Sequence, residues 1–290
     1  MKQSFRILKQ IQKLKERYCR IALEKESLLK IINEIEVAEQ VYNSNAIENS
    51  TLTLEETEKI LLQIDLDRFI NERELFEAKN LARVVNYINK KAIEKELSLE
   101  IILFLHKMLI SNIRDDIAGR FRNNNEYVRV GNHIAPSSNK VLSLLKEMLV
   151  KYKSYDLGNI IKRISRLHLT FEYIHPFVDG NGRIGRVINN YSLIREGYVP
   201  INIKFFDRKE YYLAFQEFNK TGTTNLMDKL VGLALCQSFH KRLAYLEDKK
   251  IITLKEFFKQ SNFSYSNLLN KANRQTIEAF LEKGIWKIGI

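Results

Sequence analysis

Apolar residues recur at alternating steps of three and four along the first part of the chain. This spacing gathers them on one face of an amphipathic helix, and Lys25 is the only break in it. The stripe consists of Ile7, Ile11, Leu14, Tyr18, Ile21, Leu28 and Ile32. We predict one long helix, which could pack on its own domain or pair with a second copy of the chain as a homodimer.

Helical patterns continue through "TLEETEKILLQI" and "ERELFEAKNLARVVNYINKKAI". Thr53 and Glu56 have the spacing of a capping box at the start of the first of these segments. After Pro136 helical spacing resumes and runs to about residue 245, with interruptions in the stretch 173–186 and near Pro200. The pattern predicts a mostly α-helical protein.

The stretch "GRFRNNNEYVRVGNHIAP", residues 119–136, does not follow the helical pattern of its neighbours. Residues 127–131 alternate between two faces, and the asparagine run 123–125 is able to turn the chain. We predict a short β-hairpin here.

The tail, residues 250–290, combines short helices with a closing strand. Thr253 and Glu256 form a second capping-box pattern, a Ser/Asn turn follows, and another helix is expected to begin near Ser264. Trp286 falls in the closing strand. This is the layout of a helix-turn-helix with a wing, which could bind DNA or serve as a protein-contact or packing module.

The net charge of +12 is concentrated at the two ends of the chain. Residues 1–30 hold nine Lys/Arg against three Asp/Glu, and residues 249–290 hold eight against three. Either end could meet an anionic partner or form a solvated lysine-rich face.

Other features bound the class of protein. A length of 290 residues with 45% hydrophobic content suits one large or two smaller globular domains. No window approaches eighteen consecutive apolar residues, and the basic N-terminus lacks the apolar run of a secretory signal, so we expect no membrane span. Cys19 and Cys236 cannot make a disulfide framework. These features together favour a cytoplasmic protein.

The densest chemistry lies in "YIHPFVDGNGRIGR", residues 173–186. Pro176 ends the preceding helix, and glycines 180 and 182 let main-chain N–H groups approach a ligand closely. A new helix is expected from Arg183, so these N–H groups sit at a helix N-terminus that favours anions. Arg183 and Arg186, one turn apart, point toward the same anion. The stretch predicts a polyphosphate cradle, although it is not a Walker P-loop.

An acid and an imidazole complete this cradle. Asp179 beside a phosphate site makes sense if its carboxylate holds Mg²⁺, which takes one or two carboxylates plus phosphate oxygens. His175 has a pKa near neutrality in water and could remove a proton from an attacking hydroxyl. The combination predicts phosphate chemistry with a hydroxyl nucleophile.

These residues resemble the signature of the Fic (Fic/DOC) family, HxFx(D/E)GNGRxxR. Every defined position is filled, by His175, Phe177, Asp179, Gly180, Asn181, Gly182, Arg183 and Arg186. The segment 119–136 resembles the family's β-hairpin flap over the active site. Residues Ser44, Glu48 and Asn49 match the inhibitory motif (S/T)xxxE(G/N), which here precedes the signature as in the class with an N-terminal inhibitory helix.

The resemblance implies a Fic-type helical bundle with a short β-hairpin flap and a small C-terminal winged-helix domain. The expected division is an N-terminal helical region at 1–100 with the inhibitory motif at 44–49, a Fic core at 101–245 with the flap at about 119–136 and the signature at 175–186, and the winged-helix domain at 250–290.

The resemblance also implies protein AMPylation, in which AMP moves from ATP to a Ser, Thr or Tyr hydroxyl of a target protein or of the chain itself. The roles implied are the general base for His175, a core anchor for Phe177 and the Mg²⁺ ligand for Asp179. The backbone at 180–182 would form the anion hole. Arg183 would meet the β-phosphate side and Arg186 the γ-phosphate, while the flap would align an extended segment of the target by main-chain pairing.

Glu48 gains a role from the same resemblance. Its carboxylate would pair with Arg186 and hold the enzyme in check, and in some relatives this glutamate also supports removal of AMP. Three alternatives stay open: transfer of phosphate instead of AMP, removal of AMP as the main activity, and a DNA-binding regulator with the Fic core as sensor. His168, seven residues before His175, is expected to be a packed core histidine.

Overall fold

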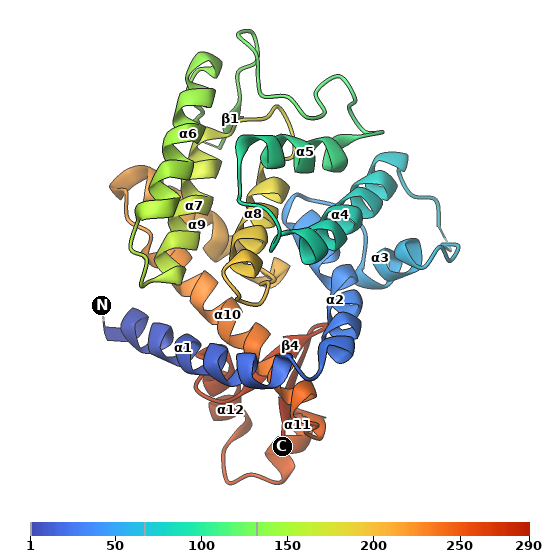
Figure 1. Ribbon diagram of the computed structural model, residues 1–290. Helices are drawn as coiled ribbons and strands as arrows, with labels where there is room; N and C mark the ends of the chain where they lie inside the picture. Colours follow the sequence, from blue (N-terminus) through green and yellow to red (C-terminus); the bar gives the residue numbers. More distant parts are fainter. Residues whose placement is uncertain (1, 67, 132) are drawn as a thin grey trace.

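The computed structural model describes residues 2–66, 68–131 and 133–290, with side chains from Arg6 onward. Most of the chain is helical, as the sequence predicts (Figure 1). The α-helices are, in chain order, α1 (Lys2–Ala22), α2 (Glu26–Ile47), α3 (Leu54–Leu61), α4 (Glu72–Lys91), α5 (Leu99–Ile110), α6 (Ser138–Ser154), α7 (Ile160–Ile174), α8 (Asn181–Arg195), α9 (Arg208–Thr221), α10 (Asn225–Leu246), α11 (Leu254–Lys259) and α12 (Tyr265–Asn273). A single 3-10 turn, η1 (Phe205–Asp207), precedes α9. The strands are β1 (Arg129–Val130), β2 (His133–Ile134), β3 (Ile251–Thr253), β4 (Ala279–Glu282) and β5 (Ile285–Gly289).

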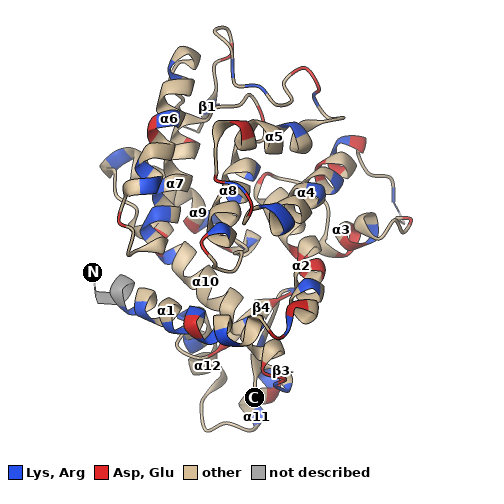
Figure 2. Cartoon of the chain, viewed as in Figure 1, with Lys and Arg blue, Asp and Glu red and all other residues tan. Residues whose placement is uncertain are grey.

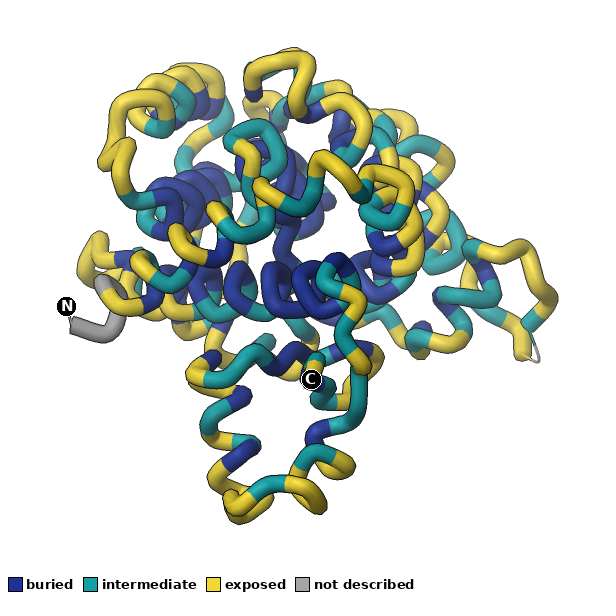
Figure 3. Tube along the Cα trace, turned by 60° about the horizontal axis from the view of Figure 1, so that its bottom comes forward, coloured by how far each residue is buried: buried dark blue, intermediate teal, exposed yellow. Residues whose placement is uncertain are grey.

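Helix α8 lies at the centre of the main body and is buried along most of its length (Figure 1). One apolar core gathers side chains from α2 to α8, so helices on both sides of residue 100 share it. A second core joins α1, α7, α9 and α10. Figure 3 shows the buried stretches in the middle of the body and the exposed ones on its outer loops. The central position of α8 fixes the loop that precedes it.

The N-terminal stripe is divided between two helices, so the prediction of one long helix is wrong. Helix α1 ends at Ala22 and α2 begins at Glu26. Lys25 lies at the break because its Nζ donates to the backbone oxygen of Leu246 at 2.7 Å and pairs with Asp248 at 2.6 Å, just after α10. This anchor lets α1 pack along α10 while α2 turns toward α4. The apolar stripe of α1 is therefore covered by its own chain.

The predicted hairpin is confirmed, but its turn lies elsewhere than expected. Strands β1 and β2 are antiparallel, with Val130 opposite His133. The chain reverses at Gly131, whose φ of +58° suits glycine. The asparagine run makes a separate turn upstream, in which the N–H of Glu126 donates to the Asn123 oxygen at 3.0 Å. The hairpin is short and largely exposed.

Both predicted capping boxes are confirmed, at Thr53 with Glu56 and at Thr253 with Glu256. The second opens α11 of the tail, and α12 and the closing strand β5 follow in the predicted order, whereas β3 and β4 are strands that the sequence analysis did not predict. The tail's three strands pair antiparallel in the order β3-β5-β4 around a small core of their own. No helix in the described ranges has the length and apolar content needed to span a lipid bilayer.

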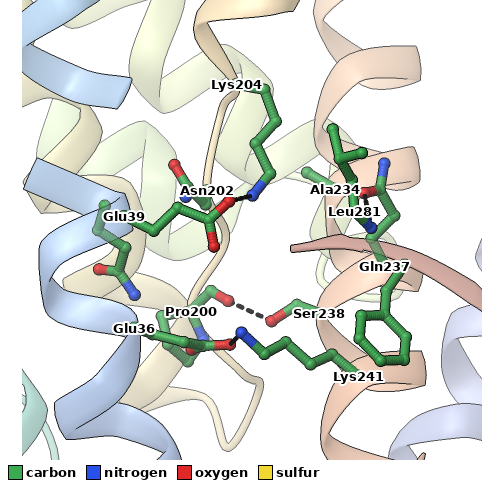
Figure 4. Close-up of a pocket in the computed structure, with 12 residues that line it drawn as sticks. Glu36, Glu39, Pro200, Asn202, Lys204, Ala234, Gln237, Ser238, Lys241 and Leu281 are labelled. Carbon is green, nitrogen blue, oxygen red and sulfur yellow. Dashed lines mark hydrogen bonds and ion pairs between the residues drawn. The ribbon is translucent and has the colours of Figure 1, made fainter. Parts of the chain in front are cut away.

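A cluster of buried charges joins the tail to the main body (Figure 4). Lys241 on α10 lies 2.7 Å from Glu282 of β4 and 3.3 Å from Glu36 of α2. Lys204 pairs with Glu39, also on α2. The amide of Lys283 donates to the same Glu39 carboxylate. Paired charges thus hold the tail against α2 and α10.

Candidate functional site

The loop between α7 and α8 carries the predicted site, and its backbone is sharply bent at both ends. His175 follows the last residue of α7 with a φ of +48°, and Gly180 precedes α8 with a φ of +82°. Helix α8 begins at Asn181, two residues earlier than the sequence predicts. Asn181, Gly182 and Arg183 therefore form its first turn, where N–H groups have no partner within the helix.

Asn181 braces this loop with its side chain. Its Oδ1 accepts from the N–H of Phe177 at 2.9 Å, and its Nδ2 donates to the oxygen of the same residue at 2.9 Å. The Phe177 ring is fully buried and stacks on His106, with centroids 3.7 Å apart and planes 3° apart. The loop is thus closed by one amide and anchored by one ring.

His106 on α5 supports the signature loop, and the sequence analysis missed it. The N–H of Gly119 donates to its Nδ1 at 3.0 Å, so the ring hydrogen is on Nε2, which donates to the backbone oxygen of Asp179 at 3.0 Å. Burial lowers the pKa of His106 to about 4, which keeps the ring neutral. His106 thereby links the start of the flap to the signature loop.

Arg122 is a second residue that the sequence analysis missed. Its Nε donates to the backbone oxygen of His175 at 2.7 Å, and its Nη2 donates to the oxygens of Ile174 at 3.2 Å and Pro136 at 2.8 Å. Its own N–H donates to the oxygen of Pro176 at 2.9 Å. Arg122 therefore holds both ends of the flap segment to the turn that carries His175. No spacing in the sequence marks it, because all these partners are backbone atoms brought together by folding.

The imidazole of His175 is neutral and has a defined tautomer. Its Nδ1 lies 3.2 Å from the backbone oxygen of Glu172, which can only accept, so Nδ1 carries the hydrogen. Burial lowers the pKa of His175 to about 4. The lone pair on Nε2 is consequently free to take a proton.

Glu172, one turn before His175, is a further buried group that the sequence analysis missed. Its Oε2 lies 3.6 Å from His175 Nδ1. Burial, helped by the charge of Glu48, raises the pKa of Glu172 to about 8. Its carboxyl is therefore largely protonated at neutral pH.

A cavity of about 960 Å³ lies between the loop, the hairpin and α9. This volume is at the upper end of the roughly 300–1,000 Å³ usual for ligand sites. His175 and the signature loop line one side, and Val130, Gly131 and His133 of the hairpin line another. Tyr211, Tyr212 and Phe215 of α9 add an aromatic wall. The cavity can take a ligand with a flat apolar part and a charged part.

Asp179 lies on the rim of this cavity with several positive or polar neighbours. Its Oδ1 accepts from the N–H of Gly180 at 2.6 Å and lies 3.2 Å from Arg183, and its Oδ2 lies 2.6 Å from Arg73. Burial by itself would raise the pKa of Asp179, but Arg183 and Arg73 lower it below its ordinary value. The carboxylate is ionised at neutral pH, as a Mg²⁺ ligand must be. Because Gly180 donates to Asp179, its N–H is not free for a ligand, unlike the N–H groups of the first turn of α8.

Arg186 joins the signature to the end of α2. Its Nη2 donates to Glu48 Oε1 and to the backbone oxygen of Ser44, and its Nε donates to Ser44 Oγ, all at 2.9 Å. Its Nη1 donates to the Tyr211 hydroxyl at 3.0 Å. Burial would lower the pKa of Arg186, but Tyr211 and Glu48 raise it above its usual value. The structure thus brings the two motifs together, 138 residues apart in the chain.

Local geometry explains the residue types at two further motif positions, Gly182 and Asn49. A Cβ added at Gly182 would lie 2.2 Å from Glu48 Oε1, so only glycine lets that carboxylate approach. Asn49 has a φ of +71°, a conformation that asparagine tolerates better than most residues, and its Oδ1 accepts from Arg208 at 2.6 Å. His168 is fully buried as predicted, and its Nε2 lies 2.8 Å from the Tyr211 hydroxyl.

Comparison with known proteins agrees with this geometry. The family model described as Fic/DOC family matches residues 96–193. The chain carries a Fic/DOC domain. Over 189 residues it is 30% identical to the protein adenylyltransferase Fic of Nematostella vectensis, which covers 62% of this chain and 43% of that relative. The chain therefore spans less than half the length of that curated relative.

Solved structures share the fold of the Fic domain and its surroundings. A Fic domain containing signaling protein from Bacteroides thetaiotaomicron superposes with a TM-score of 0.73 at 22% identity, over 83% of this chain and 97% of that one. A Fic family protein from Desulfovibrio desulfuricans G20 superposes with a TM-score of 0.68 at 18% identity, over 100% of this chain and 96% of that one. The second likeness extends the shared fold through the tail.

Proposed function

We propose that this chain is a protein adenylyltransferase, which transfers AMP from ATP to a Ser, Thr or Tyr hydroxyl of a target protein or of itself. The observation that carries the proposal is the neutral imidazole of His175, with Nε2 free, beside the first turn of α8 in a cavity of ligand size. The name of the Nematostella vectensis relative, protein adenylyltransferase Fic, supports the same reaction.

In the proposed reaction His175 Nε2 removes the proton of the target hydroxyl. The hydroxyl oxygen then bonds to the α-phosphorus of ATP, the bond from that phosphorus to the bridging oxygen breaks, and pyrophosphate leaves with the electron pair. The bound triphosphate brings negative charge, which raises the pKa of His175 from its low value toward neutrality. The proton finally passes from the imidazole to solvent.

The phosphates would lie at the N-terminus of α8. Backbone N–H groups of Asn181, Gly182 and Arg183 point along the helix axis toward an anion there. The guanidinium of Arg183 would meet the β-phosphate side, and that of Arg186 the γ-phosphate. Gly180 would shape this anion hole without donating to the phosphates, since its N–H already donates to Asp179.

Mg²⁺ fits the donor set at Asp179. Within the described ranges no group of three His, Cys, Asp or Glu could hold a metal ion by itself. A single ionised carboxylate on the cavity rim is nevertheless what Mg²⁺ uses when phosphate oxygens and water supply its other ligands. Bound there, the ion would neutralise charge on the phosphates.

The exposed hairpin would hold the target. Val130 and Ile134 are 42% and 71% exposed, and among the described residues strands β1 and β2 pair only with each other. An extended segment of the target could add to this edge by main-chain hydrogen bonds and place its hydroxyl near His175.

The free thiols of Cys19 and Cys236 suit a reducing compartment, so we place the reaction in the cytoplasm.

Glu48 would restrain the enzyme. Its carboxylate occupies the Arg186 guanidinium that the γ-phosphate needs, so ATP would bind in an unproductive pose. A charge-assisted hydrogen bond of this kind contributes about 1.5–3 kcal/mol. That free energy corresponds to roughly one to two decades of inhibition.

The test uses the Glu48→Gly chain with ATP labelled at the α- or the γ-phosphate, incubated with Mg²⁺ and cell extract. Label from the α-position on protein, together with no γ-label beyond that of the extract alone, supports AMP transfer. Additional γ-label that appears only when the Glu48→Gly chain is present would instead establish phosphate transfer and overturn the proposal. Chelation of Mg²⁺ with EDTA should abolish labelling in either case.

Removal of AMP is a second candidate, and it rests on the same carboxylate. Glu48 is 36% exposed and lines the cavity that contains His175, where it could orient an attacking water. A target labelled by the Glu48→Gly chain and then given to the unaltered chain would lose its label if this activity dominates. If the target keeps its label in the presence of the unaltered chain, removal of AMP is excluded as the main activity.

A further inference from the structure

The two basic ends of the chain lie side by side in the fold. Helix α1 runs along the border between the main body and the tail (Figure 1). Gln10 Nε2 donates to the backbone oxygen of Gln275 at 2.9 Å, although the two residues are 265 positions apart. Arg17 lies 2.6 Å from Glu278 and also pairs with Glu247. The positive charge of residues 1–30 and that of residues 249–290 therefore belong to one region of the surface.

A hollow of about 670 Å³ separates α1 from the tail, and cations line its α1 side. Arg6, Lys9, Lys13 and Arg17 all face it, with Thr276 and Ile277 opposite. Steps of three and four place these four residues on one stripe of the helix. Figure 2 shows that blue, the colour of Lys and Arg, recurs along α1. Among the described residues no carboxylate lies within ion-pair distance of Arg6 or Lys13.

Two of the tail's three acids are paired with cations, and the third, Glu256, contacts Thr253 in the capping box of α11. Glu278 pairs with Arg17 and Lys249, and Glu282 pairs with Lys241 and Lys287. Several tail cations, in contrast, have no ion pair with any described carboxylate: Lys250, Lys255, Lys259, Lys271 and Arg274. The free charge of the tail is thus almost entirely positive.

Helix α12 exposes a row of polar, uncharged side chains. Leu268 and Ala272 point into the tail core. The exposed positions of the helix and its cap include Ser266, Asn267, Asn270 and Asn273. Amide and hydroxyl side chains hydrogen-bond the edges of bases, whereas Lys and Arg contact phosphates.

We propose that α12 and the cationic stripe of α1 form one binding face for duplex DNA. Helix α12 enters the major groove with its amide side chains, and Arg6 and Lys13 contact the neighbouring phosphates across the hollow. An A-form RNA duplex would not fit this geometry, because its major groove is too narrow for a helix. An acidic protein would need the cations but would leave the amide row unused. This face is separate from the cavity at His175 and does not depend on AMP transfer.

The test is fluorescence anisotropy of the full chain with a labelled mixed-sequence DNA duplex, at several salt concentrations. Two double variants, Lys271→Glu with Arg274→Glu and Arg6→Glu with Lys13→Glu, should each weaken binding at least ten-fold at 100 mM salt. Each should also lower the slope of log K against log salt by about 2, since roughly 0.9 counterion is released per phosphate contact. Lys90→Glu with Lys146→Glu makes the same charge change on exposed positions of α4 and α6, and should alter binding two-fold or less.

Several outcomes would overturn the proposal. If the α1 double variant binds like the control while the tail variant does not, the joined face is wrong. If the unaltered chain binds single-stranded RNA or anionic vesicles as tightly as the duplex at equal salt, the assignment to duplex DNA is wrong. Circular dichroism of each variant shows whether its helices are intact, so that a folding defect is not counted as a loss of contact.

Discussion

The signature loop at 175–186 and the end of α2 at 44–49 both meet at Arg186, but they are held in different ways. The loop is fixed by buried contacts to backbone atoms, such as the two hydrogen bonds between Asn181 and Phe177. The end of α2 reaches Arg186 through the backbone oxygen and hydroxyl of Ser44 and through the carboxylate of Glu48, whose side chain is 36% exposed. The first arrangement resists change, whereas the second can be displaced by a ligand that competes for one guanidinium. Changes in the two regions should therefore have opposite effects on transfer.

The largest effect is expected at His175. In the Glu48→Gly background, His175→Asn should lower label transfer from α-labelled ATP by about 10²–10⁴-fold, because the proton acceptor is lost. Asparagine is chosen because residue 175 has a positive φ, which asparagine tolerates better than alanine does. The melting temperature should change little. Transfer at more than a tenth of the starting rate would remove His175 from the role of base.

An effect of opposite sign is expected at Glu48. Glu48→Gln keeps the size of the side chain but removes the charge that holds Arg186, and should raise transfer roughly 10–100-fold, in line with the free energy of a charge-assisted hydrogen bond. Initial rates at saturating ATP measure it. Glu34→Gln, an exposed position on the same helix, is the matched control. Equal rates for all three chains would show that the contact with Arg186 does not restrain the enzyme.

The same contrast explains what could be predicted from the sequence. The roles in the loop follow from residue types within one short stretch, because His175, Asp179 and the first turn of α8 are neighbours in the chain. Glu48 has no local chemistry that marks it, and only the resemblance to a known motif singled it out. Its contact with Arg186 depends on how α2 packs.

The residues that support the loop could not be predicted, for a related physical reason. Arg122 and His106 bind backbone oxygens of residues 53 and 73 positions away, and backbone atoms leave no signature in a sequence. The break between α1 and α2 was hidden in the same way. Lys25 interrupts the apolar stripe, but its partners are Leu246, the last residue of α10, and Asp248 just after that helix.

A smaller effect, on stability, is expected at Asn181. Asn181→Ala leaves the buried N–H and oxygen of Phe177 without partners, which should lower the free energy of unfolding by about 2 kcal/mol. Urea unfolding followed by circular dichroism measures it. Asn273→Ala, an exposed position in the tail, should change stability by less than about 0.5 kcal/mol. A loss at Asn181 no larger than at Asn273 would mean that the loop is not braced by this amide.

The smallest effect concerns pH and distinguishes Glu172 from the exposed carboxylates. The pKa of Glu172 is raised to about 8 from an ordinary 4.5, so between these values the folded chain holds a proton that the unfolded chain has released. The contribution of Glu172 to the free energy of unfolding is fully present below pH 4.5. It is lost as pH rises toward 8, by at most about 1.4 kcal/mol per pH unit. Gln does not titrate. Between pH 6.5 and 8 the free energy of unfolding of Glu172→Gln should therefore fall by on the order of 1 kcal/mol less than that of the unaltered chain.

His106 and His175, whose pKa values are lowered to about 4 in the fold, are present in both chains, so their contribution to the pH slope cancels in the difference. Glu147→Gln, on an exposed ion pair of α6, should show the same pH slope as the unaltered chain. Urea unfolding at the two pH values gives the slopes. If Glu172→Gln also follows the unaltered chain, then Glu172 is already ionised in the fold. Its carboxylate would then be a fixed negative charge 3.6 Å from His175 Nδ1. Charge as well as backbone contact would then control the basicity of the His175 imidazole.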